Sequence, residues 1–450
     1  MPPLPSPALL ARQARLAALP AGAVVDAVEG VVRRRLGQDP EQVRRRLRQR
    51  GAERTRRVLG DLKGGALKAG QLLSTVEALF PPDPEGTWRQ ALTSLQQDNP
   101  ALPFEQVEPV LRAELGAGWR TRLVGFEQQA AAAASLGQVH RATWPDGRPV
   151  AVKVQYPGVR EALSADLAAV SVATRAAALV ARGLTLPPLL AELRTRLVEE
   201  LDYVREGEHQ QRFADAYAED PDVVVPRVLL ATPRVLVTEW LDGVPLARVA
   251  VDGTAAQRDR AGLLYQRFLL SGPERAGLLH TDPHPGNFRL VTGEDGPQRL
   301  GVLDFGSCLV LPDGMPRAFG RLIRVLLSDD DAEVLAGLRE EGFLRPDRTV
   351  EVRKLVDYLG PFSEPARHET FSYSRSWLRS QFARVNDPRN PEFAVALQLD
   401  IPADLLFTHR VWLGIVGVLS QLEATVPVRP ELERWLPGFA GSERPERMQA

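Results

Sequence analysis

The chain has 450 residues, a length that fits two or three domains. Its 44% hydrophobic and 25% charged residues are typical of a folded soluble protein. The net charge of −1 excludes a general electrostatic attraction to nucleic acid or anionic lipid. The single cysteine, Cys308, excludes an internal disulfide, and we expect it to be a small buried side chain in a protein of a reducing compartment.

No segment reaches the ~20 apolar residues that a membrane span needs. The best candidate, Val411 to Leu422, is too short and contains Ser420 and Gln421. Prolines and arginines interrupt the opening residues, which do not resemble a signal peptide. We expect a cytoplasmic protein, either soluble or in peripheral contact with the inner face of the membrane.

Residues 1–118 are expected to form a helical extension, with a break at Asn99-Pro100. Between Arg33 and Arg57 lie eleven arginines and only three acidic residues. Two interpretations stay open for this stretch. It either contacts anionic lipid headgroups or forms a solvated surface with internal salt bridges.

Residues 61–80 carry apolar side chains at helical spacing and predict an amphipathic helix that ends at a proline-rich stretch. Lys68 and Gln71 stand three residues apart on its polar side, so their side chains are neighbours. Only four of the 56 basic residues are lysines. This bias suggests that lysine is kept where a compact ammonium group is needed.

From Trp119 onward the pattern changes to strands, with a hairpin turn at Asp146-Gly147. The strand after this turn contains Val-Ala-Val-Lys at 150–153, the form of the lysine-bearing strand of protein kinases. We therefore expect Lys153 to contact the α- and β-phosphates of a nucleotide. The predicted strands span residues 122–126, 137–142, 149–155, 223–225 and 235–238.

A helix is predicted over residues 189–216, with leucines and a valine along one stripe. Glu200 lies inside that stripe, where an unpaired carboxylate would be costly. Lys153 is its natural partner; the alternative is a glutamate tolerated at the helix edge. After the next strands, Glu239 and Leu241 lie in a segment similar to the linker between kinase lobes, whose backbone holds an adenine.

Two acidic motifs follow. Residues 280–287 read His-Thr-Asp-Pro-His-Pro-Gly-Asn, and residues 302–306 read Val-Leu-Asp-Phe-Gly. This is the order of the catalytic and metal-binding loops of kinases. We expect Asp282 to orient the acceptor, and Asn287 and Asp304 to bind Mg²⁺. Ordinary polar turns use the same residue types, but the pair in this order makes that alternative weaker. The apolar flanks predict short buried strands.

The rest of the chain is expected to be mainly helical up to residue 435, with a flexible tail over 436–450. Residues 375–391 are polar and rich in arginine, and are expected to form an exposed crossing. The histidines are scattered, so no metal cluster is expected. The clearest helices lie over residues 315–345, 350–360 and 395–423.

Together these motifs resemble the UbiB/AarF family of atypical kinases, whose members are associated with coenzyme Q and prenyl-quinone lipids. The resemblance covers residues 30–320 and weakens beyond them. Four segments carry it: a Lys-x-Gly-Gln motif at 68–71, an alanine-rich loop at 132–140, a Glu-x-Asp motif at 200–202 and the catalytic loop at 280–287.

The resemblance implies an α+β, protein-kinase-like fold of two lobes behind the helical extension. The small sheet lobe would span residues 119–240 and the helical lobe residues 241–435. It also implies that Lys68 and Gln71 face the active site. The nucleotide would lie against an alanine-rich loop, formed by Ala133, Ala134 and Ser135.

Alanine cannot adopt part of the backbone conformations open to glycine, so this loop should cover phosphates differently from a glycine-rich loop. The alanine-rich loop and the implied position of Lys68 and Gln71 at the active site both argue against ordinary protein phosphorylation. They favour an ATPase that uses ATP and Mg²⁺ and supports prenyl-quinone or other isoprenoid lipid metabolism. The expected partners are ATP, a prenyl-lipid or quinone precursor and an anionic membrane surface, without nucleic acid.

One departure from the family pattern is Gly207, which stands in the predicted helix where the family has alanine; a mid-helix glycine costs about 1 kcal/mol. Two other functions stay open. One is a nucleotide-binding scaffold for lipid-modifying enzymes without turnover. The other is a phosphotransferase that acts on small molecules.

Overall fold

The computed structural model describes scattered positions between residues 29 and 53, and residues 101–134, 136–161, 201–292, 298–328, 330–345, 348, 350–385, 399 and 405–440. The predicted helix at 61–80 with Lys68 and Gln71, and also Ser135 and Glu200, lie outside the described residues. The chain divides into two compact units. Unit 1 comprises Met1–Arg205 and Val228–Trp240, and unit 2 comprises Glu206–Arg227 and Leu241–Ala450.

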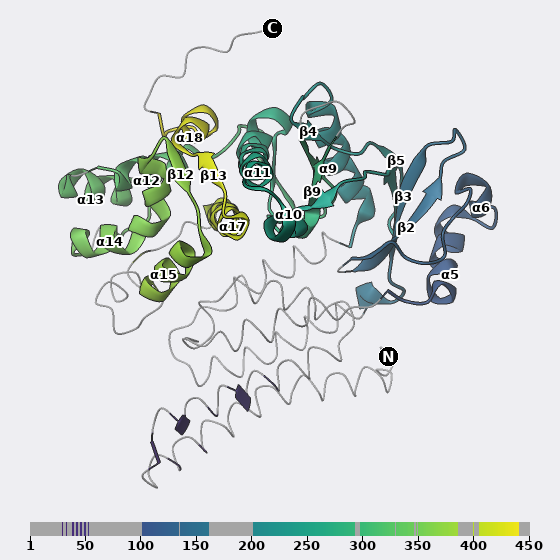
Figure 1. Ribbon diagram of the computed structural model, residues 1–450, viewed down its shortest axis with the longest axis horizontal. Coiled ribbons are helices and arrows are strands. Elements are labelled where there is room, and N and C mark those ends of the chain that lie inside the picture. The colour runs from purple at the N-terminus through teal and green to yellow at the C-terminus, as the bar shows by residue number, and fades with distance from the viewer. Residues whose placement is uncertain are drawn as a thin grey trace, which may run out of the picture. The chain divides into compact units, whose positions relative to one another are not determined.

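Unit 1 is built on a five-stranded antiparallel sheet in the order β1-β2-β3-β6-β5. Along β3, Val152 and Val154 are buried on one face and Lys153 lies on the other, as the two-residue period of a strand requires. Helix α5 lies beside this sheet (Figure 1), and its Leu111 belongs to the same hydrophobic core as Val152 and Val154. The elements are α5 (Phe104–Leu115), α6 (Trp119–Arg122), β1 (Ala132–Ala133), β2 (Gly137–Thr143), β3 (Pro149–Gln155), β5 (Val228–Ala231) and β6 (Val235–Glu239).

The strand predicted at 122–126 was wrong. Residues Trp119–Arg122 form the helical turn α6, and Val124 makes only an isolated bridge to Thr143. Trp119 is buried and meets the ring of Phe126 edge-on, with centroids 5.0 Å apart. This tertiary contact of a large aromatic side chain outweighs the weak strand propensity of a five-residue segment.

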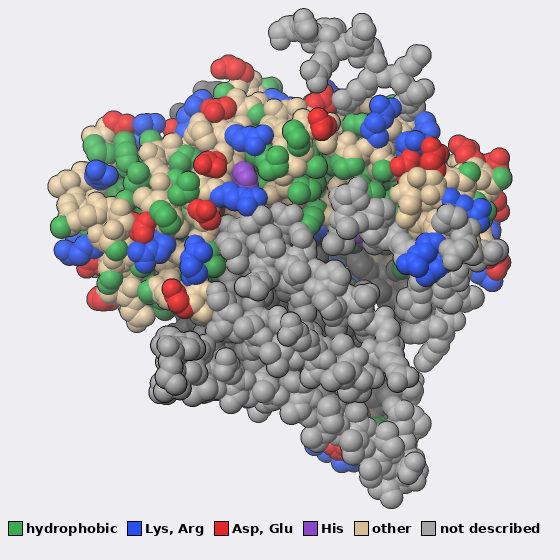
Figure 2. Space-filling model, turned by 180° about the vertical axis from the view of Figure 1, so that it is seen from behind, with side chains coloured by type: hydrophobic (Ala, Val, Ile, Leu, Met, Phe, Trp, Pro, Cys, Tyr) green, Lys and Arg blue, Asp and Glu red, His purple; other side chains and the backbone are tan. Residues whose placement is uncertain are grey.

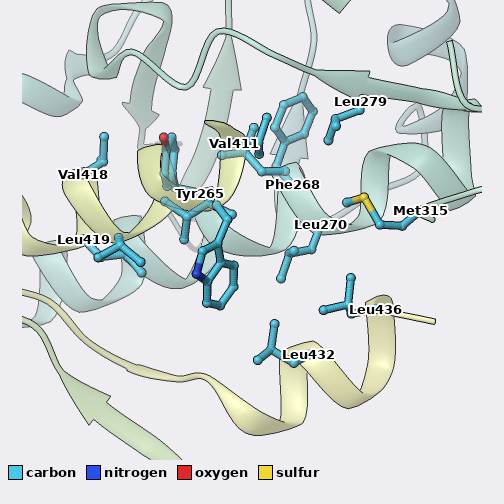
Figure 3. Close-up of a cluster of buried hydrophobic side chains, with 14 of the residues drawn as sticks. Tyr265, Phe268, Leu270, Leu279, Met315, Val411, Val418, Leu419, Leu432 and Leu436 are labelled. Carbon is cyan, nitrogen blue, oxygen red and sulfur yellow. The ribbon is translucent and has the colours of Figure 1, made fainter. Parts of the chain in front are cut away.

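Unit 2 is organised around α11, a helix of 22 residues that begins with a capping box between Thr254 and Gln257 and ends at Gly277 in the left-handed conformation. Its apolar side chains pack against α17, as Figure 3 shows for Phe268 and Val411. The elements beside it are β7 (Val244–Pro245), α10 (Leu246–Asp252), α11 (Ala255–Ala276), α17 (Leu406–Leu422), β13 (Thr425–Pro427) and α18 (Arg429–Trp435).

A four-stranded sheet in the order β4-β10-β9-β7 carries the central part of unit 2, and β8 pairs with β11. Short strands predicted around the acidic motifs are confirmed, and their side chains are largely buried. The remaining elements before the C-terminal helices are β4 (Val223–Val224), β8 (Leu278–His280), η2 (Pro285–Asn287), β9 (Phe288–Val291), β10 (Arg299–Val302) and β11 (Cys308–Val310).

Helix α9 (Tyr203–Ala216) begins later than the helix predicted over 189–216, of which residues 189–200 lie outside the described chain. Asp202 precedes the helix, and its carboxylate accepts from the N–H of Val204 at 3.1 Å. The helix continues through Gly207. From Glu206 onward it groups with unit 2 rather than with the sheet lobe, because residues such as Phe213 join the core around α11.

The helix predicted over 315–345 is two helices, α12 (Arg317–Leu326) and α13 (Asp331–Glu340). Asp330 separates them by capping α13, since its carboxylate accepts from the N–H of Ala332 at 2.8 Å. Farther along lie α14 (Val352–Ser363), η3 (Glu364–Arg367) and β12 (Thr370–Ser372).

The exposed crossing expected over 375–391 was wrong in its described part, because Arg375–Val385 forms helix α15, while residues 386–391 lie outside the described residues. Its Trp377 packs edge-on against Phe371 and donates its indole N–H to Glu364 at 3.0 Å. The expected tail is likewise packed at its start. Leu436 and Phe439 are buried in the core of unit 2.

The face drawn in Figure 2 shows basic and acidic side chains interspersed among apolar ones over the described surface. This mixture agrees with the net charge of −1. Within the described ranges, no helix is both long and apolar enough to cross a membrane.

A network of ion pairs joins α11 to α18 in unit 2. Arg267 lies 2.6 Å from Asp222 and 2.8 Å from Glu431, which also accepts from the indole N–H of Trp435 at 3.1 Å. Beside the network is a cavity of about 500 Å³, lined by Asp220, Asp222, Glu274, Arg267, Arg275 and Arg434. Because Arg267 is held on both sides by carboxylates, we assign the network a role in stability.

Replacing Arg267 with methionine should lower the free energy of unfolding by about 3 kcal/mol, because buried Glu431 loses its cation. Arg429 pairs with Glu433 at 2.9 Å on the exposed surface, so Arg429→Met should cost less than about 1 kcal/mol. Chemical denaturation of both variants measures the difference. Equal losses would contradict the assignment.

Candidate active site

The two acidic motifs are held next to each other by backbone hydrogen bonds in unit 2. The N–H of Thr281 donates to the carbonyl of Ser307 at 3.0 Å. On the other side of the loop, β9 and β10 pair antiparallel, and just beyond their last pair the N–H of Leu303 donates to the carbonyl of Asn287 at 3.0 Å. These bonds bring the segment that carries Asp282 beside the segment that carries Asp304.

Asp282 and Asn287 are in direct contact. The side-chain Nδ2 of Asn287 donates to the Asp282 carboxylate at 3.0 Å and to its carbonyl at 3.1 Å. Because a carboxylate only accepts, the amide nitrogen must face it, which leaves the amide oxygen for a cation. Asp304 accepts from the N–H of Gly306 at 3.0 Å through one carboxylate oxygen. Amide and carboxylate oxygens are the ligands that Mg²⁺ prefers, so this donor set fits the ion.

Buried side chains form hydrogen bonds to the backbone of both loops. His280 donates a ring N–H to the carbonyl of Asp304 at 2.6 Å, and burial lowers the pKa of His280, which keeps the ring neutral at pH 7. Tyr265 donates its hydroxyl to the carbonyl of Pro283 at 2.6 Å. Burial, and then the charge of Asp282, raise the pKa of Tyr265 far above its usual range. The predicted burial of Cys308 is confirmed.

Unit 1 carries the predicted lysine. Lys153 lies in the middle of β3, and its ammonium nitrogen is 5.1 Å from the ring centre of Tyr203, the first residue of α9. Glu239 ends β6 and pairs with Arg148 at 3.1 Å. Leu241 belongs to unit 2, where its side chain packs against Gly301 of β10.

The alanine-rich loop forms a hairpin at the edge of the sheet in unit 1. Ala133 pairs with Gln138, and the N–H of Ala134 donates to the carbonyl of Gly137 at 2.8 Å. A Cβ at Gly137 would overlap the carbonyl of Val154, so only glycine allows this hairpin to approach β3. The Ala134 amide is therefore used inside the hairpin.

Two other residues of this loop are buried in a polar network. The ring Nδ1 of His140 is 2.8 Å from the carbonyl of Glu127, and its Nε2 is 2.9 Å from the Gln138 amide nitrogen. The Gln138 amide also exchanges hydrogen bonds with the backbone of Leu102. The carbonyl of Glu127 accepts, so His140 carries its proton on Nδ1 and receives the Gln138 N–H on Nε2. The network joins the residues before α5 to the sheet.

A model of the family described as the ABC1 atypical kinase-like domain matches residues 94–337. The chain belongs to the ABC1 family. The mitochondrial atypical kinase COQ8B of Danio rerio is 32% identical over 66% of this chain and 47% of its own. The mitochondrial atypical kinase coq-8 of Caenorhabditis elegans is 30% identical over 84% of this chain and 50% of its own. The chain thus spans about half the length of these curated relatives.

Among solved structures, a complex of Rv3197 from Mycobacterium tuberculosis with erythromycin is 38% identical to this ABC1 protein. The match covers 90% of this chain and 100% of that chain, with a TM-score of 0.68. The predicted fold class is confirmed: the protein has the α+β, two-lobed fold of protein kinases, with the five-stranded sheet in unit 1 and most of the described helices in unit 2.

Sequence reasoning on this ABC1 chain missed Glu206. It is buried on α9, and a Cβ added to Gly306 of the Asp-Phe-Gly motif would lie 3.5 Å from its Oε2. The signal was present, because Glu206 follows Tyr203 by three residues and precedes Gln210 by four on the buried face of the helix. A carboxylate on the buried face of a helix is more often part of a functional or structural site than an ordinary surface group.

Acidification should destabilise the protein through His140. Burial lowers its pKa below the unfolded value of about 6.5, so the unfolded chain binds the proton first and stability is lost as the pH falls below that value. The loss from one such group is at most about 1.4 kcal/mol per pH unit. Denaturation from pH 7 to pH 5 should show a smaller loss for His140→Gln than for the native chain. Parallel curves would exclude a neutral, buried His140.

Proposed function

We propose that this protein is an atypical kinase-like ATPase of the UbiB/AarF type, which binds Mg-ATP and supports prenyl-quinone or other isoprenoid lipid metabolism. The observation that carries the proposal is the arrangement of Asp282, Asn287 and Asp304 in unit 2. The base-like carboxylate and two hard oxygen donors stand on adjacent loops, as phosphoryl transfer requires.

Each residue then has a distinct role. Lys153 holds the α- and β-phosphates, and Glu200 pairs with Lys153. Asn287 and Asp304 hold Mg²⁺, which when bound neutralises charge on the phosphates. Asp282 orients the attacking water or hydroxyl and takes its proton. The remaining nucleotide contacts come from the alanine-rich loop, the linker and the N-terminal helix: Ala133, Ala134, Ser135, Glu239, Leu241, Lys68 and Gln71.

The proposed site of action is the cytoplasmic side of a membrane, reached by peripheral contact. The eleven arginines between Arg33 and Arg57 would meet anionic headgroups, and the substrate would be a prenyl lipid or quinone precursor. The net charge of −1 gives the chain no general attraction to anionic lipid. The proposal of membrane contact and of a prenyl-lipid substrate is therefore supported by the resemblance to the UbiB/AarF family.

Release of phosphate from γ-labelled ATP in the presence of Mg²⁺ tests the proposal. Replacing Lys153 by methionine should lower turnover at least about 100-fold, because the negative charge on the α- and β-phosphates loses its partner. Lys354, which pairs with Glu351 at 2.6 Å on the surface of unit 2, provides the matched control. Lys354→Met should retain native turnover.

Asp304→Asn should abolish Mg²⁺-dependent nucleotide binding, because an amide has half the oxygen donors of a carboxylate and no charge. An unchanged affinity for the nucleotide would contradict the assignment of Asp304 as a Mg²⁺ ligand. Tight binding without label transfer in the native protein would favour the scaffold. Label on a small-molecule hydroxyl would favour the phosphotransferase.

A second candidate function is binding of a macrolide, favoured by the erythromycin complex of the 38% identical Mycobacterium tuberculosis protein. Titration calorimetry with erythromycin, with and without Mg-ATP, tests it. Heat that saturates at one equivalent supports macrolide binding. No heat at a concentration of about 1 mM removes this candidate.

A further inference from the structure

The catalytic loop is packed between two helices of unit 2. Pro283, the residue after Asp282, receives the Tyr265 hydroxyl of α11 on its carbonyl at 2.6 Å. Against its ring lies Gly414 of α17. A Cβ built on Gly414 would overlap the ring, standing only 2.6 Å from Pro283 Cβ. Glycine is required here because no larger side chain allows the helix this close to the loop.

One turn earlier on the same helix, Arg410 points to the same part of the loop. Its guanidinium nitrogen Nη2 is 3.9 Å from Oδ1 of Asp282, while Asn287 donates to Oδ2. Both Arg410 and Asp282 are about one-fifth exposed, so water screens their attraction only in part. The two oxygens of the carboxylate therefore face groups from two different elements.

Helix α17 is itself firmly held. Val411, Val418 and Leu419 pack with Tyr265 and Phe268 of α11 (Figure 3). A helix fixed in the core on one face can hold a loop on another, because packed interiors deform little. Residues 406–422 lie beyond the segment 94–337 that matches the family model, so the match does not account for α17.

We propose that α17 positions the catalytic loop, with Arg410 as a positioning residue for the Asp282 carboxylate and Gly414 as the close contact that sets the distance. This inference rests on the proposed function, in which Asp282 orients the attacking group. Arg410 acts through Asp282 and not on the nucleotide. Loss of either residue should therefore lower the rate of the chemical step and leave Mg-ATP affinity unchanged.

Single-turnover ATP hydrolysis and Mg-ATP affinity should be measured for matched pairs of variants. Arg410→Met and Gly414→Ala should slow hydrolysis about 10- to 100-fold, because a displacement of about 1 Å of a reacting group costs that much. Arg410→Lys should recover part of the rate. The controls are Arg321→Met, which breaks ion pairs with Glu340 and Glu341, and Gly417→Ala, where an added Cβ meets none of the described residues within 4 Å.

Native rates in Arg410→Met and Gly414→Ala would overturn the inference. A parallel loss of Mg-ATP affinity in Arg410→Met would overturn it as well, because Arg410 would then bind the nucleotide directly. Gly417→Ala and Arg321→Met should keep both quantities within about threefold of native values.

Hydrogen–deuterium exchange of the amides over 281–288 tests the same inference without catalysis. Exchange should be faster in Arg410→Met and Gly414→Ala than in the two controls, with peptides of β3 in unit 1 unchanged. Equal exchange in all four variants would overturn the positioning role. If the native protein hydrolyses no ATP, the proposed function fails, and this comparison alone decides whether α17 orders the loop.

Discussion

The antiparallel pairing of β9 with β10 is the constraint on which the candidate site depends. Phe288 pairs with Val302. Asn287, which precedes Phe288, therefore meets Leu303, which follows Val302, in the next hydrogen bond. A shift of one residue in this register would turn every side chain to the other face and separate Asn287 from Asp304. The register is secured because Phe288 and Val302 are both fully buried. A core requirement thus determines the geometry of polar loops at the surface.

The site is also supported by polar groups that are costly to bury. His280, Tyr265 and Glu206 all lie in the interior of unit 2. A buried imidazole, hydroxyl or carboxylate that is kept from water must find its hydrogen bonds inside the protein, and each such bond has a strict geometry. His280 and Tyr265 donate to backbone carbonyls of the two loops. Their burial weakens the core but gives the loops a single position, as pre-organised catalysis requires.

Residues with a local chemical signature were predictable from the sequence. The order of Asp282, Asn287 and Asp304, the strand around Lys153 and the turn at Asp146-Gly147 all depend on short motifs, and the strands that flank them are present. The failures depend on tertiary contacts. The buried ring of Trp119 stabilises a helical turn that ends at Arg122, where a strand was predicted to begin. Trp377 packs α15 against the core within a segment whose arginines suggest exposure. A pattern of polar and apolar residues does not record which aromatic ring finds a partner.

The glycines of α17 also show that a local sequence pattern does not record tertiary contacts. Gly414 and Gly417 stand three residues apart on α17 in a similar apolar context, yet a Cβ added to Gly414 would overlap Pro283, whereas one added to Gly417 would meet no described side chain within 4 Å. Helix propensity treats both alike, at about 1 kcal/mol each relative to alanine.

In the alanine-rich loop, the residues of the family motif differ from the residue that makes the close contact. The family motif draws attention to Ala133 and Ala134, whereas the close approach is made by Gly137, next to the carbonyl of Val154. The N–H of Ala134 donates to the carbonyl of Gly137, so this amide is used within the hairpin and is not available to a phosphate. A nucleotide bound here would depend correspondingly more on Lys153 and on Mg²⁺ for the compensation of its charge.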